Sequence, residues 1–168
     1  MKPRVSIIMG STSDLPVMEK AAAILNDFKI PFEINALSAH RTPDEVEKFA
    51  GEAAGRGIEV IIAAAGMAAH LPGVIAAMTT IPVIGVPVKA SLEGLDALLS
   101  IVQMPPGIPV ATVGINAAQN AGILAAQIIA TADEDVRREL VDFKSKLKDK
   151  IVKANSQLKE VKYDYKTN

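Results

Sequence analysis

The chain contains no cysteine among its 168 residues, which excludes disulfides, thiolate metal sites and cysteine nucleophiles. It has no apolar stretch of the roughly 20 residues that a membrane-spanning helix needs, and its N-terminus lacks the pattern of a signal peptide. The net charge of −1 offers no bulk attraction for nucleic acid or for an anionic membrane. We therefore expect a soluble, cytoplasmic protein that binds neither nucleic acid nor membrane.

Apolar segments of strand length alternate with helical patterns over most of the chain, which is typical of βαβ units. The five expected strands are Val5–Met9, Phe32–Leu37, Glu59–Ala65, Pro82–Val86 and Pro109–Val113. The expected helices are about Leu15–Phe28, one opened by Thr42-Pro43-Asp44-Glu45, His70–Thr79, about Leu92–Val102 and Asn116–Ala130. Such chains form a parallel sheet with helices on both faces. With an assumed strand order of 2-1-3-4-5, ligands bind beyond the carboxyl ends of strands one and three.

The character of the sequence changes after Thr131, where a heavily charged helix begins near Asp133. Its apolar residues form one narrow stripe, typical of a long helix with a single buried face. The stripe consists of Val136, Leu140, Phe143, Leu147 and Ile151. We expect one domain, with an α/β core over residues 1–132 and a helical arm over residues 133–168. The arm is expected to lie on this domain or on a neighbouring subunit.

The loop after the first strand is Gly10-Ser11-Thr12-Ser13-Asp14. A glycine, three hydroxyls and a helix N-terminus form a favourable site for a phosphate. The Asp14 carboxylate would repel that anion and is better suited to ribose hydroxyls. A plain turn, in which Ser13 or Asp14 caps the following helix, explains this loop equally well.

The loop after the second strand contains His40 and Arg41, followed by Thr42 as the expected helix cap. Histidine ionises near neutral pH, so His40 is a candidate for proton transfer. Arg41 can hold a phosphate with two hydrogen bonds. The alternatives are a histidine that hydrogen-bonds the backbone and an ordinary surface arginine.

The loop after the third strand contains His70 among alanines and glycines. Small residues let the backbone approach a planar ligand closely, although tight helix packing favours them as well. His70 is equally well explained as a structural histidine with satisfied hydrogen bonds. Two histidines without nearby carboxylates or cysteines make a weak metal site, so we expect no metal.

Several segments together resemble the class I N5-carboxyaminoimidazole ribonucleotide mutases of purine biosynthesis, in order and in spacing. They are Met9-Gly10-Ser11-Thr12-Ser13-Asp14, Ser38-Ala39-His40-Arg41-Thr42-Pro43, Ala68-Ala69-His70-Leu71-Pro72-Gly73, Pro82-Val83-Ile84-Gly85-Val86-Pro87-Val88, Leu98-Leu99-Ser100-Ile101-Val102-Gln103-Met104-Pro105, Gly107-Ile108-Pro109-Val110-Ala111-Thr112-Val113 and Asn120-Ala121-Gly122. The resemblance covers residues 5 to about 130 and hardly extends into the charged tail.

The resemblance implies a flavodoxin-like three-layer sandwich, a homo-octamer, and a small ribonucleotide substrate. The implied reaction uses no cofactor, metal or ATP and moves a carboxyl group from the exocyclic nitrogen to ring carbon C4. By the same resemblance His40 is the general acid/base, while Ser11, Asp14 and Arg41 bind the ribose phosphate. The rest of the implied substrate pocket consists of Ser13, Ser38, Ala39, Ala65, Gly66, Ala68, Ala69, His70 and Leu71. The family usually has glycine where this chain has Met67.

Three other functions are compatible with this architecture. The sister enzyme that carboxylates aminoimidazole ribonucleotide directly with carbon dioxide shares the fold and much of the site. A receiver domain needs an aspartate at the end of strand three, where this chain has Ala63-Ala64-Ala65. A flavin-binding module usually offers aromatic residues, and the three loops have no tyrosine, phenylalanine or tryptophan. The loop Ala68-Ala69-His70-Leu71-Pro72-Gly73 and the segment Gly85-Val86-Pro87 favour the mutase over the carboxylase.

Overall fold

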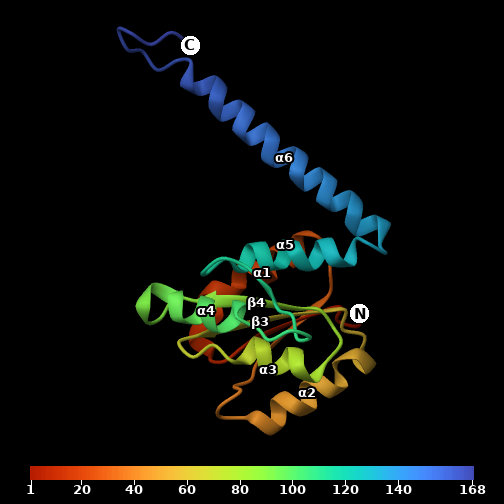
Figure 1. Ribbon diagram of the computed structural model, residues 1–168. Coiled ribbons are helices and arrows are strands. Elements are labelled where there is room, and N and C mark those ends of the chain that lie inside the picture. Colours follow the sequence, from red (N-terminus) through yellow and green to blue (C-terminus); the bar gives the residue numbers. More distant parts are fainter.

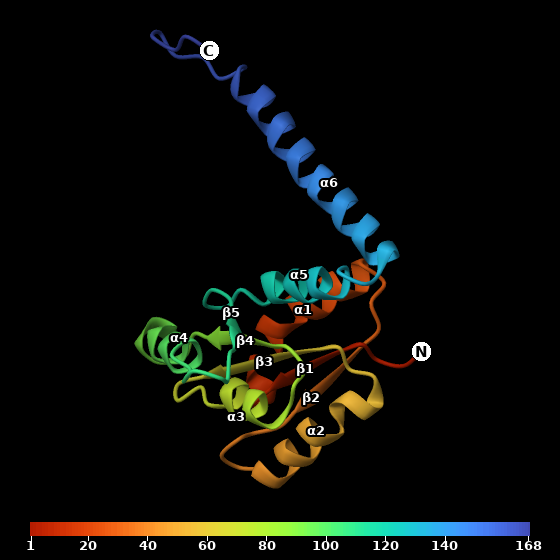
Figure 2. The same cartoon turned by 45° about the vertical axis from the view of Figure 1, so that its right-hand side comes forward.

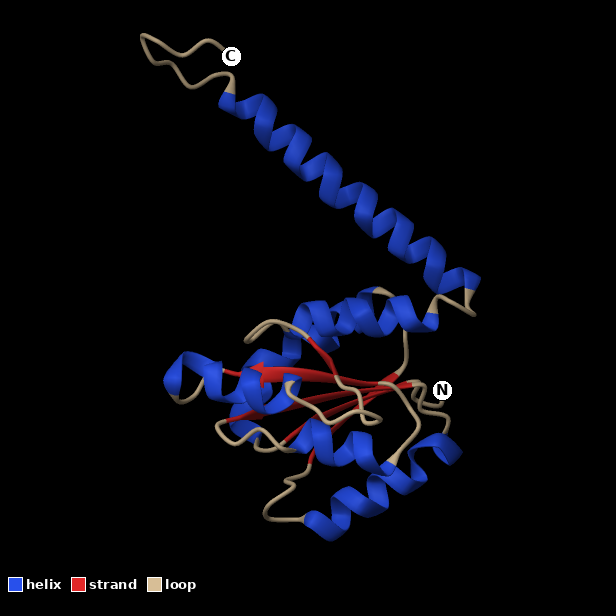
Figure 3. Ribbon diagram, viewed as in Figure 1, coloured by secondary structure: helices blue, strands red, loops and turns tan.

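A five-stranded, entirely parallel sheet lies between two layers of helices (Figures 1 and 3) in the computed structural model, which describes residues 1–168. The strand order is β2-β1-β3-β4-β5. The strands are β1 (Val5–Met9), β2 (Phe32–Ala36), β3 (Val60–Gly66), β4 (Val83–Val88) and β5 (Ala111–Thr112). This order and layering confirm the flavodoxin-like sandwich. They also place β1 and β3 side by side at the point where the strand order reverses.

The helices cover both faces of the sheet (Figure 2). On one face lie α1 (Leu15–Asp27) and α5 (Ala118–Ile129), and on the other α2 (Pro43–Arg56), α3 (Leu71–Met78) and α4 (Leu95–Val102). Short 3-10 turns precede α1 and α4. None of the helices is both long and apolar enough to span a membrane.

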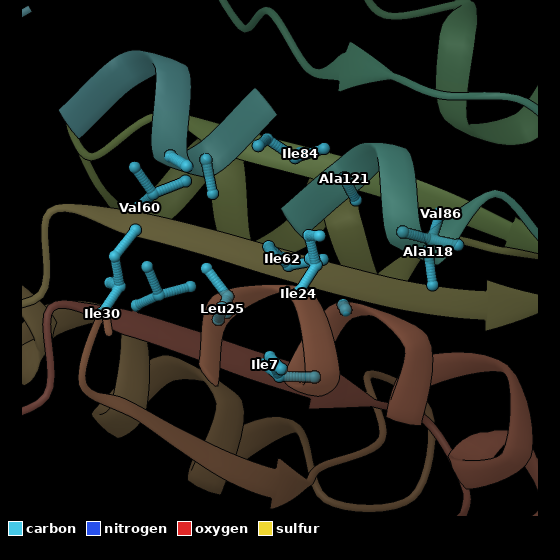
Figure 4. Close-up of a cluster of buried hydrophobic side chains, with 14 of the residues drawn as sticks. Ile7, Ile24, Leu25, Ile30, Val60, Ile62, Ile84, Val86, Ala118 and Ala121 are labelled. Carbon is cyan, nitrogen blue, oxygen red and sulfur yellow. The ribbon is translucent and has the colours of Figure 1, made fainter. Parts of the chain in front are cut away.

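The central strands are buried on both faces, which explains why they are apolar at nearly every position. Ile7 and Ile62 point into the cluster beneath α1 and α5 (Figure 4). Their neighbours Ile8 and Ile61 belong to the cluster beneath α2, α3 and α4. Because successive side chains of a strand point to opposite faces, one apolar run supplies both cores.

Helices α1 and α5 cross closely, and Gly122 makes this approach possible. A Cβ atom at Gly122 would lie 2.2 Å from Cγ2 of Ile24 and 3.1 Å from the carbonyl oxygen of Ala21. Helix α5 is rich in alanine and isoleucine, but it has a solvent-exposed face that includes Gln119 and Gln127. Only the alanine-rich face of this helix is buried against α1 and the sheet.

Strand β5 is shorter than the predicted Pro109–Val113 and pairs only through Ala111 and Thr112. Pro109 has no N–H group to give to a strand ladder, which limits the pairing. Strand β4 extends further than expected, to Val88, because it still pairs with β3 there. Pro87 is tolerated since β5 does not reach it.

The arm is the helix α6 (Glu134–Leu158), which projects away from the sheet (Figure 1). Asp133 caps it by accepting hydrogen bonds from the N–H groups of Asp135 and Val136, at 3.0 and 3.1 Å. The other Asp133 oxygen pairs with Arg4 at 2.6 Å, and the Arg4 guanidinium lowers the pKa of this carboxyl. The start of α6 is therefore fixed to Arg4, the residue that directly precedes β1.

The predicted stripe of α6 divides into a packed half and a free half. Val136 and Leu140 are buried, and Phe143 packs edge-on against Phe28 with ring centroids 5.4 Å apart. Leu147 and Ile151 are exposed. The arm thus lies on its own domain as far as Phe143 and is unpartnered beyond it.

Candidate active site

The loops that leave β1, β2 and β3 meet at the carboxyl edge of the sheet, as the sequence predicts. They enclose a crevice with a volume of about 420 Å³. The residues that line it are Gly10, Ser11, Ser13, Asp14, Ser38, Ala39, His40, Arg41, Ala65, Gly66, Met67, Ala68, Leu71 and Ala90. The β1 and β2 loops contribute the hydroxyls and charges, whereas the lining at and after the ends of β3 and β4 is apolar and consists of alanine and glycine together with Met67 and Leu71.

The Ser11 hydroxyl organises the β1 loop. It accepts hydrogen bonds from the N–H group of Ser13 at 3.3 Å and from the Ser13 hydroxyl at 3.0 Å. The expected side-chain cap on α1 by Ser13 or Asp14 is absent, because Ser11 caps the preceding 3-10 turn instead. The Asp14 carboxylate is therefore not used as a helix cap.

Asp14 is partly buried where it lines the crevice. Burial raises the pKa of its carboxyl above the ordinary value, while hydrogen bonding to Ser13 and the charge of Arg41 oppose this shift. A carboxylate in this position accepts hydrogen bonds, and ribose hydroxyls are suitable donors.

Arg41 connects the β1 and β2 loops. Its guanidinium donates to the carbonyl oxygen of Gly10 at 2.6 Å and to the hydroxyl of Ser38 at 3.3 Å. These bonds use Nε and one terminal nitrogen, so the other terminal nitrogen remains available to an anion. The Arg41 side chain therefore holds the two loops together and also places a positive charge in the crevice.

Thr42 does not cap α2 with its side chain, contrary to the sequence expectation. Its hydroxyl instead accepts a hydrogen bond from the N–H group of Ser38 at 2.9 Å and donates to the Ser38 carbonyl oxygen at 3.1 Å. Both bonds close the turn that contains Ala39, His40 and Arg41. The threonine therefore shapes the loop that carries the candidate catalytic residue.

His40 of the β2 loop and His70 of the β3 loop contact each other. Nε2 of His40 lies 2.9 Å from Nδ1 of His70, and the two rings are nearly perpendicular, at 84°. A hydrogen bond between two ring nitrogens requires one N–H donor and one lone pair, so these nitrogens share a single proton. The sequence singled out both histidines and did not predict that they touch.

The β3 loop provides the apolar side of the crevice. At Gly66, a Cβ atom would lie 3.2 Å from the carbonyl oxygen of Val88 and 3.3 Å from Cβ of Ala90. Close packing against the end of β4 therefore accounts for this glycine. Met67 follows with a left-handed backbone, at φ 55°, a conformation that favours glycine.

Ala69 and His70 do not line the crevice, although the sequence analysis included both. Ala69 is fully buried in the core beneath α2, α3 and α4, and His70 contributes through its contact with His40. Ala90 also lines the crevice, although it lies beyond the end of β4 and belongs to no motif that would have predicted it. The only available signal was its position after a strand that ends at this edge of the sheet.

A histidine pair, an arginine and hydroxyl groups lie at an open crevice where the strand order reverses, so the chain is a parallel α/β protein whose crevice suits a small anionic molecule. Comparison with known families extends this description. The family model described as AIR carboxylase matches residues 4–150, which is most of the chain. The chain belongs to this family.

Curated relatives agree with this assignment. A Thermotoga maritima protein named N5-carboxyaminoimidazole ribonucleotide mutase is 56% identical over 162 residues, which cover 96% of this chain and 95% of the relative. A Pyrococcus abyssi protein of the same name is 58% identical over 147 residues, covering 87% and 84% respectively. A Candida glabrata phosphoribosylaminoimidazole carboxylase is 52% identical over 97% of this chain, but the match spans only 29% of that larger protein.

Solved structures are similar to this chain in fold and in sequence. The crystal structure of Treponema denticola PurE superimposes with a TM-score of 0.86 at 31% identity, covering 94% of this chain and 99% of that one. A PurE2 variant from the same organism gives the same TM-score and identity, with 95% of this chain covered.

Proposed function

We propose that this protein is an N5-carboxyaminoimidazole ribonucleotide mutase of purine biosynthesis, with His40 as its general acid and base. It converts N5-carboxyaminoimidazole ribonucleotide into 4-carboxy-5-aminoimidazole ribonucleotide. The observation that carries the proposal is the convergence of His40, Arg41 and Asp14 on one crevice with an alanine-lined opposite side. The names and high identity of the relatives that match the whole chain point to the same reaction.

The polar side of the crevice suits the ribose phosphate. Arg41 would bind the phosphate through the N–H groups that its bonds to Gly10 and Ser38 leave free, because charge-assisted hydrogen bonds to phosphate are the strong ones. Ser11 and Ser13 would add hydroxyl contacts, and Asp14 would accept hydrogen bonds from the ribose. The aminoimidazole then faces the alanine-lined side of the crevice.

His40 would move protons in both halves of the reaction. Protonated His40 donates to the carbamate nitrogen, the nitrogen–carbon bond breaks with its electron pair going to nitrogen, and carbon dioxide is released. Ring carbon C4 attacks the carbon dioxide, a carbon–carbon bond forms, and neutral His40 removes the C4 proton. His40 ends protonated as it began, so a single imidazole completes the cycle.

The remaining pocket residues would have supporting roles. His70 would orient the His40 ring through the 2.9 Å contact, since a catalytic imidazole needs a fixed tautomer. Ser38 would hold the Arg41 guanidinium. Uncharged walls would keep the carbon dioxide close to C4, which is a proximity effect. These walls consist of Ala39, Ala65, Gly66, Ala68 and Leu71, with Ala69 packed behind them.

A turnover assay tests this function. Purified protein is given N5-carboxyaminoimidazole ribonucleotide without added bicarbonate, ATP or metal, and we expect the C4-carboxylated isomer as product. Product formed only from aminoimidazole ribonucleotide and high carbon dioxide would support the direct carboxylase instead. This second substrate is included because two of the relatives are named as carboxylases. No reaction with either substrate would contradict both functions.

The protein is also proposed to assemble as a homo-octamer in the cytoplasm, where residues 1–132 form the catalytic unit and residues 133–168 the arm. Strand β4 is apolar but is buried within its own sheet, so it offers no surface for assembly. Exposed apolar side chains lie instead on α4 and its preceding turn and on the free half of α6. They are Leu92, Leu95, Leu99, Val102, Leu147, Ile151, Val152 and Leu158.

Charge and function support this assembly and location. Residues 143–168 contain eight lysines against three acidic residues, whereas the whole chain has a net charge of −1. The free part of the arm is therefore attracted to the acidic body of another copy. The cytoplasmic location is in keeping with relatives that are metabolic enzymes.

Light scattering at micromolar concentration tests the assembly. We expect a particle of eight 17.7 kDa chains, and we expect Leu99→Asp to yield smaller particles, because it places a charge in an apolar contact. Lys2→Asp, a charge change at the exposed N-terminus, is the control and should leave the particle size unchanged. A monomeric wild-type protein would contradict the octamer.

A further inference from the structure

Met67 is the one long, movable side chain on the apolar side of the crevice. The other apolar residues on that side are Ala65, Ala68, Ala90 and Leu71. The alanines are short, and Leu71 is only 2% exposed because it packs into the core. Met67 is 59% exposed, and a methionine side chain has three rotatable bonds and an adaptable thioether.

The backbone holds Met67 at the crevice in a conformation that side chains disfavour. Its φ of 55° lies in the left-handed region, where residues with a Cβ other than asparagine and aspartate are strained. Four other non-glycine residues have positive φ, and all lie outside the crevice: Lys29, Leu92, Glu93 and Asn116. Met67 is thus the one residue of these five that combines backbone strain with a place in the candidate site, where strain can be part of the mechanism. A residue with a long side chain at this position therefore calls for a functional explanation.

The proposed reaction, on which this inference rests, creates a need that Met67 can meet. Between the two bond changes, carbon dioxide is free and has no charge for Arg41 or Asp14 to bind. The crevice lies at the surface, with His40 and Ala68 both exposed. If carbon dioxide leaves before C4 attacks it, the enzyme releases aminoimidazole ribonucleotide and the carboxyl group is lost.

We propose that Met67 closes over the bound substrate and retains the carbon dioxide until C4 captures it. The thioether side chain extends the alanine-lined side of the crevice, so carbon dioxide lies between apolar surfaces rather than against water. Its flexibility lets the substrate enter and the product leave. Met67 acts by proximity and takes no part in proton transfer.

The test is an isotope-retention experiment on the full-length protein. N5-carboxyaminoimidazole ribonucleotide labelled with ¹³C in its carboxyl group is converted in buffer that contains unlabelled bicarbonate. Retained label in the product and released aminoimidazole ribonucleotide are both measured. We expect the wild type to retain most of the label. In Met67→Gly the fraction of label that is lost should be roughly tenfold larger than in the wild type, because the side chain that holds carbon dioxide close to C4 has been removed.

Two further variants separate side-chain character from backbone strain. Met67→Leu keeps an apolar side chain of similar size and should retain label like the wild type. Met67→Asn suits the left-handed backbone but is short and polar, and it should lose label like Met67→Gly. Thermal unfolding of each variant confirms that the compared proteins are folded.

The outcomes distinguish this inference from the proposed function. Equal label retention by Met67→Gly and the wild type would overturn the role of Met67 and leave the mutase intact. The role of Met67 would also be overturned if Met67→Leu lost as much label as Met67→Gly. A long apolar side chain would then not be what retains carbon dioxide. A wild-type protein that converts no substrate would overturn the mutase itself.

Discussion

The His40→Asn variant is expected to lose turnover by roughly 10²–10⁴-fold, the range for removal of a general acid/base. Asparagine is close to histidine in shape and still forms hydrogen bonds, but it carries no proton that ionises near neutral pH. Because the proposed mechanism uses His40 in both halves of the reaction, both the release of carbon dioxide and its capture should slow. Steady-state kinetics with N5-carboxyaminoimidazole ribonucleotide measures kcat and KM separately, and the loss should fall on kcat.

His70→Asn is the matched comparison, since His70 sits across the 2.9 Å contact from the same ring. It should reduce kcat by roughly tenfold or less, the smaller loss expected of a residue that orients the base without exchanging protons with the substrate. Circular dichroism and thermal unfolding establish that both variants are folded. Substantial turnover by folded His40→Asn would show that another group transfers the proton. A larger loss in His70→Asn would move the catalytic role to His70.

The architecture could be predicted from sequence because the sheet is buried on both faces. Strands such as Val5–Met9 must then be apolar throughout, and the alternation with helices leaves few possible topologies. The three loops could be located because each directly follows a strand whose carboxyl end lies at one edge. Strand ends were less predictable, as β5 illustrates: how far it pairs depends on where Pro109 falls relative to β4.

The site was harder to predict wherever it depends on contacts between loops. The His40–His70 contact joins residues 30 positions apart, and no local pattern encodes it. Ser11 and Thr42 illustrate a second difficulty, since a hydroxyl near a helix start can cap the helix or close a neighbouring turn. Both hydroxyls close turns in this chain. Ala69 looked equivalent to Ala68 in sequence, but one is fully buried and the other is exposed to the crevice.

The Arg41→Met variant is expected to raise KM by roughly 100-fold with little change in kcat. Charge-assisted hydrogen bonds contribute about 1.5–3 kcal/mol each, and each 1.4 kcal/mol corresponds to a factor of ten in binding. A phosphate lies far from the reacting carboxyl group and is bound equally in the ground and transition states. Loss of such uniform binding raises KM and leaves kcat unchanged. Arg41→Lys should recover part of the loss, because lysine restores the charge but not the planar fork.

The bonds of Arg41 to Gly10 and Ser38 provide a second reason for a loss of activity, and a substrate without phosphate separates the two. N5-carboxyaminoimidazole riboside has no phosphate for Arg41 to bind. If Arg41 only binds phosphate, the wild type and Arg41→Met should therefore have the same kcat and KM with the riboside. If the variant is equally impaired on the riboside and the nucleotide, Arg41 serves mainly to hold the two loops together. Arg138→Met, on the exposed surface of α6 and paired with Asp135, controls for general loss of positive charge and should leave KM unchanged. An unchanged KM in Arg41→Met would mean that the phosphate is bound elsewhere, with the Ser11 loop as the next place to look.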